Sequence, residues 1–167
     1  DEYLSSPVDR RPKFHLYRAD IALISGIAWD HINVFPTYES YQEQFRIFAD
    51  QIPITGKLVY CEADPEVKSL VEQSVTPAKK IPYGIPTHEI RNGITWLQTE
   101  SGEVDLKVFG EHNLMNLEGA RLICNLLGIE NRQFYKAIRE FTGASRRLET
   151  LARTEQVAVF KDFAHSP

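Results

Sequence analysis

The stretch Ile21–Pro36, IALISGIAWDHINVFP, decides the fold. Its first part, Ile21–Ile27, is a short and continuous apolar run, which predicts a strand covered on both faces, as in parallel sheets. The polar pair Asp30-His31 then follows, before the pattern changes. A polar pair at this place either ends the sheet in water or binds a ligand, and the rest of the sequence has to decide which.

The residues after Pro36 continue an alternation of helices and strands. Apolar side chains recur at helical spacing at Tyr38, Tyr41, Phe45, Phe48 and Ile52. We expect Thr37 to cap this helix and Pro53 to end it. A second strand is expected over 56–61, and Asp64-Pro65 starts a short helix, with aspartate at the cap and proline at the first position. This order predicts a right-handed parallel unit.

The second half of the sequence predicts further elements. The passage 77–86 is punctuated by prolines, and the segments 93–98 and 103–108 alternate at period two around a turn, which predicts an antiparallel hairpin. Two helices should end at Gly128 and Gly143, and 156–160 should be a buried strand. The fold class is therefore α/β: a mostly parallel sheet flanked by helices, with an added antiparallel hairpin.

Composition limits the classes of function. The chain has 167 residues, of which 43% are hydrophobic, enough for one domain with a real core. The net charge of -4 argues against a nucleic-acid or anionic-membrane surface. No apolar run approaches the roughly 20 residues of a membrane span. Cys61 and Cys124 lie far apart without metal-site spacing and are expected to be buried free thiols. We expect a soluble, cytoplasmic protein.

Asp30-His31 is the first of three candidate sites. In open parallel sheets, ligands bind beyond the carboxyl ends of the strands, and this pair follows the first expected strand. His31 is therefore a candidate ligand-binding residue. The alternative is a histidine that caps the following turn.

The run FGEHNLMN, residues 109–116, is the second candidate. A strand should end at Gly110 and a helix should begin near Asn113. His112 and Asn116 are four residues apart, so they project from one side of the first turn, where free amides and the helix dipole favour anionic or polar ligands. An asparagine amide both donates and accepts, as an adenine edge requires. Alternatively, Asn113 only caps the helix and Asn116 faces solvent.

The run FTGASRRLE, residues 141–149, is the third candidate. Adjacent arginines, Arg146 and Arg147, can bind phosphate through planar bidentate hydrogen bonds. The alternative is a pair of ordinary surface charges.

The order of four motifs is more specific than any of them alone. GIAWDHINVFPTYE (26–39), FGEHNLMN (109–116), FTGASRRLE (141–149) and DFAHSP (162–167) resemble the central ATPase domain of the muramyl (Mur) ligases, which build the peptide of bacterial cell walls. The opening DEY (1–3) and DRRPKFHLYR (9–18) look most like the branch that acts on a murein tripeptide. The resemblance implies a P-loop-type central domain, ATP and Mg²⁺ as cofactors, and ligation of UDP-N-acetylmuramate to that tripeptide or, in a sibling enzyme, to L-alanine.

The resemblance also implies roles for single residues. His31 corresponds to the histidine that helps to hold a magnesium ion beside the ATP γ-phosphate, which makes it the metal and catalytic candidate. His112, Asn113 and Asn116 correspond to the motif against the adenine. Arg147, and second Arg146, correspond to the arginine near the phosphates, and Arg147 is also a catalytic candidate. Asp162 corresponds to an aspartate that touches the nucleotide.

The sequence departs from the family pattern at several places, and these departures predict which part of the family's central domain the chain contains. No G-x-x-x-x-G-K-[ST] phosphate loop occurs, and the family's metal-binding glutamate would precede Asp1, so Glu2 is given no ligand role. Phe163 and Ser166 replace a tyrosine and a histidine of the last motif. We therefore expect residues 1–167 to be part of a central ATP-binding domain, to contact N-terminal and C-terminal domains of its own protein, and to be catalytically inactive alone.

Two other classes of protein remain as alternatives. The first is a structural module whose Asp-His and His-Asn motifs only stabilise turns and which no longer binds nucleotide. The second is a metal hydrolase centred on His31 and His112, which is disfavoured because no carboxylate and histidine pair has metal-ligand spacing.

Overall fold

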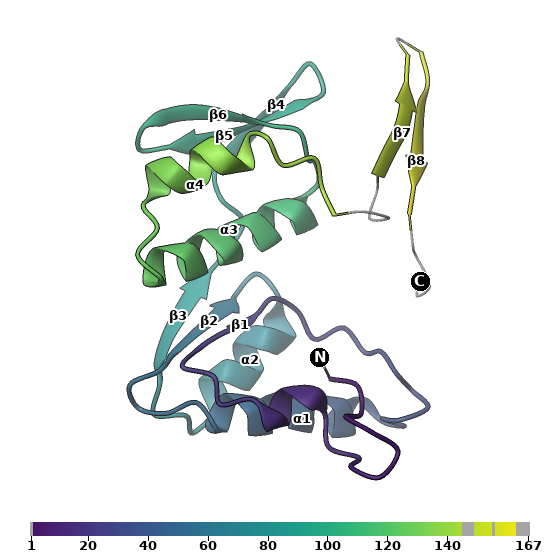
Figure 1. The fold of residues 1–167 in the computed structure, drawn as a ribbon, viewed down its shortest axis with the longest axis vertical. Helices are drawn as coiled ribbons and strands as arrows, with labels where there is room; N and C mark the ends of the chain where they lie inside the picture. Colours follow the sequence, from purple (N-terminus) through teal and green to yellow (C-terminus); the bar gives the residue numbers. More distant parts are fainter. Residues whose placement is uncertain (1, 145–148, 155, 163–167) are drawn as a thin grey trace.

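Three parallel strands form the first sheet of the computed structural model, which describes residues 2–144, 149–154 and 156–162 (Figure 1). β1 (Ile21–Ile24) pairs with β2 (Lys57–Cys61), which pairs with β3 (Lys79–Tyr83), in the order β1-β2-β3. The expected parallel unit is confirmed. β3 was not predicted, because Pro82 interrupts its pattern; proline is tolerated there because β3 is an edge strand.

Two helices cover one face of this sheet. α1 (Tyr38–Asp50) is capped by Thr37, whose side chain accepts a hydrogen bond from the Ser40 amide, and α2 (Pro65–Gln73) is capped by Asp64 in the same way. A short 3₁₀ helix, η1 (Lys13–Leu16), lies beside α1. Leu58 and Tyr60 of β2 face α1 and α2 in one core cluster, whereas Val59 and Cys61 face the opposite side.

The opposite face of the sheet packs against α3 (Glu111–Leu126). The other side of α3 packs with α4 (Asn131–Ile138) and an antiparallel sheet of β4 (His88–Arg91), β5 (Ile94–Thr99) and β6 (Gly102–Leu106). In Figure 1, α3 lies between the two sheets. The predicted hairpin is confirmed as β5 and β6, and β4 adds a third strand that was not predicted.

The last described elements are β7 (Glu149–Arg153) and β8 (Ala158–Lys161), an antiparallel pair. The predicted strand at 156–160 is present as β8, but the prediction that it is buried is wrong, because all four residues of β8 are exposed. Phe160 of β8 meets Phe109, with 5.6 Å between ring centroids. The predicted helix up to Gly143 is also too long, since α4 ends at Ile138.

The α/β fold class is confirmed. Both cysteines are free thiols, as expected, although only Cys61 is fully buried and Cys124 is half-buried. Within the described ranges, every helix is too short or too polar to cross a bilayer.

Candidate functional site

The site is built around the N-terminus of α3. Gly110 is the N-cap and has a φ of 86°, a conformation that strains any residue with a β-carbon. A β-carbon at Gly110 would also lie 2.9 Å from Cε1 and 3.1 Å from Nδ1 of His112. The helix therefore starts at Glu111, two residues before the predicted start, and the imidazole of His112 lies directly over its cap.

A cavity of about 820 Å³ opens beside this helix end. Four of the predicted nucleotide-binding residues line it together: His112, Asn113, Asn116 and Asp162. The rest of its wall is apolar and consists of Val108, Leu117, Ala120, Ile138, Phe141 and Ala144. An apolar wall with a few polar groups at one edge is typical of small-molecule and cofactor sites.

The two asparagines differ in what their amides already bind. Asn113 donates its Nδ2 hydrogen to the carbonyl of Phe109 at 2.8 Å and so closes the turn that precedes α3. It lies within the helix and is not the cap. Within the part of the chain that the structure describes, the Asn116 amide makes no hydrogen bond; it is exposed and lines the cavity. Asn116 is therefore the asparagine whose donor and acceptor are both available to a ligand.

Phe141 and Gly110 were not predicted as site residues. The sequence pattern assigned Phe141 to a helix face, but the residue follows the end of α4, is 44% exposed and lines the cavity. The signal that could have identified it is an aromatic residue just before a loop glycine, Gly143. For Gly110, the signal is a glycine at a strand-to-helix turn, two residues before a histidine.

A second polar group lies in the loop between β1 and α1. The carbonyl of His31 accepts hydrogen bonds from the amides of Val34 and Phe35, at 2.8 and 2.9 Å, so its backbone closes a turn. Its φ is 56°, in the left-handed region where a non-glycine residue is uncommon. The Asp30 carboxylate holds this backbone in place, since its Oδ1 accepts from the His31 amide at 2.6 Å.

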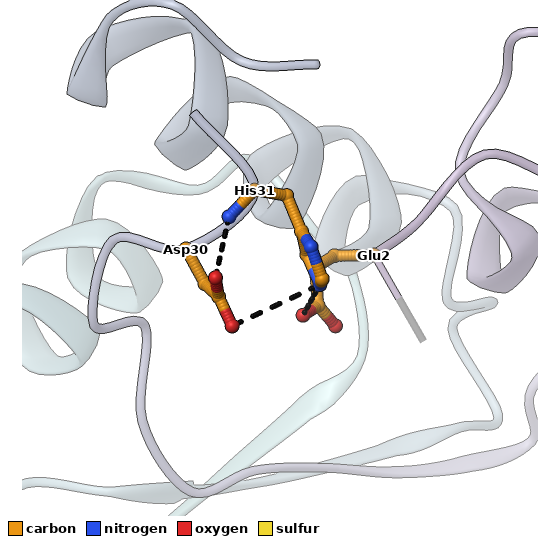
Figure 2. Close-up of side chains that lie close together, drawn as sticks. All are labelled: Glu2, Asp30 and His31. Atoms are coloured by element: carbon orange, nitrogen blue, oxygen red, sulfur yellow. Dashed lines mark hydrogen bonds and ion pairs between the residues drawn. The ribbon is translucent and has the colours of Figure 1, made fainter. Parts of the chain in front are cut away.

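The imidazole of His31 points toward two carboxylates, as Figure 2 shows. Its Nε2 lies 3.3 Å from Oε1 of Glu2 and 3.9 Å from Oδ2 of Asp30. One ligand atom from each of the three residues lies within 4.8 Å of the others, and all three side chains are partly buried. Two carboxylates and an imidazole in this arrangement can bind a divalent cation, with oxygen the preferred ligand of magnesium.

Two tyrosines border this group. The ring of Tyr3 meets the His31 imidazole edge-on, with 4.8 Å between centroids. Tyr41 of α1 is buried, and burial, followed by the negative charges of Glu2 and Asp30, raises the pKa of its hydroxyl. Tyr41 therefore remains a neutral phenol beside the acidic group.

The structure does not bring all the predicted residues into one place. The four residues of the cavity form one group, and His31 with Glu2 and Asp30 forms another. Arg146 and Arg147 lie outside the described residues. Among the described residues, the one group able to hold a metal ion contains His31 without His112, so the arrangement gives no support to a metal hydrolase built on both histidines.

Sequence comparison places these features in a family. The family profile described as "Mur ligase middle domain" matches residues 5–124. The UDP-N-acetylmuramate–L-alanine ligase of Arthrobacter sp. is 30% identical over 177 aligned positions, which cover 100% of this chain and 38% of that protein. The chain thus spans well under half the length of that relative.

Solved structures share the fold. The UDP-N-acetylmuramate:L-alanyl-γ-D-glutamyl-meso-diaminopimelate ligase of Neisseria meningitides superposes with a TM-score of 0.73 at 20% identity, covering 87% of this chain and 47% of that one. MurF ligase of Thermotoga maritima, solved in complex with ADP, superposes with a TM-score of 0.66 at 15% identity, covering 85% and 35%. The chain belongs to the Mur ligase family, with residues 5–124 corresponding to its middle domain.

Proposed function

We propose that residues 1–167 form part of the central ATP-binding domain of a ligase that uses ATP and Mg²⁺ to join UDP-N-acetylmuramate to an amine through an amide bond. The observation that supports this best is the cavity at the N-terminus of α3, which His112, Asn113, Asn116 and Asp162 line together. Members of the Mur ligase family are ATP-dependent ligases.

The cavity suits a purine base. Leu117 and Ala120 of α3 and Phe141 beyond α4 provide the apolar surface that the faces of a flat ring require. The free amide of Asn116 can donate to and accept from the edge of an adenine at the same time. The positive end of the α3 dipole favours the anionic part of the same ligand.

The group of Glu2, Asp30 and His31 suits a magnesium ion, because it offers two carboxylates and one imidazole within 4.8 Å of each other. This proposal gives Glu2 a ligand role that the resemblance had not assigned to it. When bound, the ion would neutralise charge on the transferring phosphoryl group, which phosphoryl transfer requires more than covalent help. His31 would provide one ligand, and Asp30 would fix the backbone that presents it.

Arg147, with Arg146 as second choice, completes the proposal as a phosphate-binding residue, on the resemblance alone. A guanidinium adds the planar bidentate contacts to phosphate oxygens that a carboxylate and imidazole group cannot provide. The lactyl carboxylate of UDP-N-acetylmuramate would accept the phosphoryl group, and the amine would then displace phosphate to form the amide.

The amine substrate we propose first is the murein tripeptide L-alanyl-γ-D-glutamyl-meso-diaminopimelate, which would place the enzyme in cell-wall recycling. The basis is the resemblance of the N-terminal motifs to that branch, and a structural neighbour bears this activity in its name. L-Alanine is the second candidate, because sequence relatives at 30% and 31% identity are named as L-alanine ligases.

The deciding experiment is a ligation assay on the full-length protein, with UDP-N-acetylmuramate, ATP, Mg²⁺ and the two amines in competition. Consumption of the tripeptide supports the first candidate and consumption of L-alanine the second. If neither is consumed and ATP does not bind, the ligase proposal fails in favour of a structural module. We expect the 167-residue chain alone to show no ligation, since no phosphate loop occurs in its sequence.

We also propose a cytoplasmic location, where the nucleotide substrates are made. The two free thiols, Cys61 and Cys124, are consistent with a reducing compartment.

A further inference from the structure

Helix α3 has two faces that do different things. One face, which includes Asn116, Leu117 and Ala120, lines the cavity. A second face, which includes Met115, Leu122 and Ile123, packs on the parallel sheet against Val59, Cys61 and Tyr83. A helix moves as a rigid rod over a few turns. The distance between α3 and the parallel sheet therefore also determines the position of the residues that line the cavity.

Gly119 lies in close contact with the sheet. A β-carbon at this position would lie 2.9 Å from the hydroxyl oxygen of Tyr83, 3.0 Å from its Cζ and 3.1 Å from Cδ1 of Leu23. Gly119 is buried in the middle of α3, and its φ is helical, so nothing in the local backbone requires a glycine. Glycine is a poor helix former. Its presence here is explained by the approach of the Tyr83 ring.

The buried side chain of Tyr83 has little room to move. It is 4% exposed, at the end of β3, and its hydroxyl oxygen is buried without a hydrogen-bond partner among the described residues. Burial, and then the neighbouring Cys61, raise the pKa of that hydroxyl, so it stays neutral. Cys61 in turn meets Met115 of α3, with 3.6 Å between the two sulfur atoms. The ring therefore lies in a packed layer between strand and helix.

We propose that Gly119 and Tyr83 are positioning residues of the nucleotide site: their close contact sets the depth of α3 on the parallel sheet and thereby places the Asn116 amide and the apolar wall of the cavity. This inference rests on the proposed function, because it assigns the cavity to a nucleotide. It adds two residues that do not themselves line the cavity, with Gly119 one helical turn beyond Asn116.

The test is Gly119→Ala in the full-length protein, with ATP binding measured by isothermal titration calorimetry and the variant's crystal structure determined. The added methyl group should push α3 away from β3, displace Asn116 and weaken ATP binding about ten-fold, since small misplacements of site residues are costly. The matched control is Gly84→Ala, one residue beyond Tyr83, where a β-carbon would meet nothing within 4 Å. It should bind ATP like the wild type.

A second substitution that restores ATP binding would distinguish a positioning role of Gly119 from a general loss of stability. Adding Tyr83→Phe removes the oxygen that the new methyl group meets first, and the double variant should recover part of the affinity. A lower melting temperature with unchanged ATP affinity would overturn the proposal. So would a crystal structure in which the Tyr83 ring turns and Asn116 stays in place. If the wild-type protein itself binds no ATP, the proposed function fails, and the displacement of Asn116 still decides whether Gly119 sets the helix position.

Discussion

Nε2 of His31, in the β1–α1 loop, lies 3.3 Å from Oε1 of Glu2, near the start of the chain. Because Oδ2 of Asp30 lies 3.9 Å from the same nitrogen, the group can bind a cation. In the full-length protein, Glu2→Gln should raise the Mg²⁺ concentration needed for half-maximal ligation by about ten-fold. Asp9→Asn, which alters an exposed carboxylate bound to Arg11, is the control. An unchanged Mg²⁺ requirement would exclude Glu2 from the metal site.

His31→Ala should lower kcat by about ten-fold or more and change the ATP KM little. The reason is that a ligand to a catalytic ion acts mainly on the charge that develops in the transition state, and such an interaction affects kcat. Steady-state kinetics of ligation measure both constants. His88→Ala is the control, since His88 is half-buried on β4 and its Nδ1 bonds the carbonyl of Pro86, in its own segment. Loss of ATP affinity with normal turnover would contradict the assignment.

Asn116→Ala should do the reverse, raising the ATP KM several-fold with kcat nearly unchanged. The amide is predicted to contact the adenine edge, which does not change during phosphoryl transfer, so its loss weakens ground state and transition state alike. A neutral hydrogen bond of this kind contributes about 1 kcal/mol. The control is Gln73→Ala, an exposed amide on α2 that bonds Ser69. Equal ATP KM values for the variant and the wild type would remove Asn116 from the site.

The sequence predicted the elements whose signals are local. Thr37 and Asp64 form the caps that their positions indicated, and β1, β2 and the β5–β6 hairpin follow from continuous or alternating apolar runs. β3 was missed because Pro82 removes a backbone donor, and only the position of β3 at the sheet edge allows it. Helix α3 was predicted, but its start at Glu111 depends on the positive φ of Gly110, which apolar periodicity does not show.

The same distinction between local and tertiary signals applies to the candidate site. His112, Asn113 and Asn116 share one turn of one helix, so their spacing was enough to predict that they act together. The contact of Glu2 with His31 joins two segments with a strand between them, and Phe141 reaches the cavity only because α4 ends early. Such contacts depend on tertiary packing, which periodicity does not encode.

Gly110→Ala should raise the ATP KM about ten-fold or more, because a β-carbon at 2.9 Å from the His112 ring displaces that ring from the cavity edge. The strain of a positive φ also lowers stability by about 1–2 kcal/mol. Gly102→Ala separates the two effects: Gly102 has a φ of 109° and open space around it, in the β5–β6 turn. Both variants should melt at lower temperature, and only Gly110→Ala should change the KM. If both change it equally, His112 placement is not the cause.

Phe141→Ala should raise the ATP KM about five-fold or more, since stacking of a base on an aromatic ring contributes about 1–3 kcal/mol. Phe141→Leu tests the geometry further. Leucine keeps the apolar contact but has no flat face. The ATP KM of the Phe141→Leu variant should therefore lie between those of the wild type and the alanine variant. Tyr17→Ala, which removes another exposed aromatic ring, is the control and should leave the KM unchanged. If Phe141→Ala binds ATP normally, the base lies elsewhere in the cavity, and Asn116 alone would have to account for its recognition.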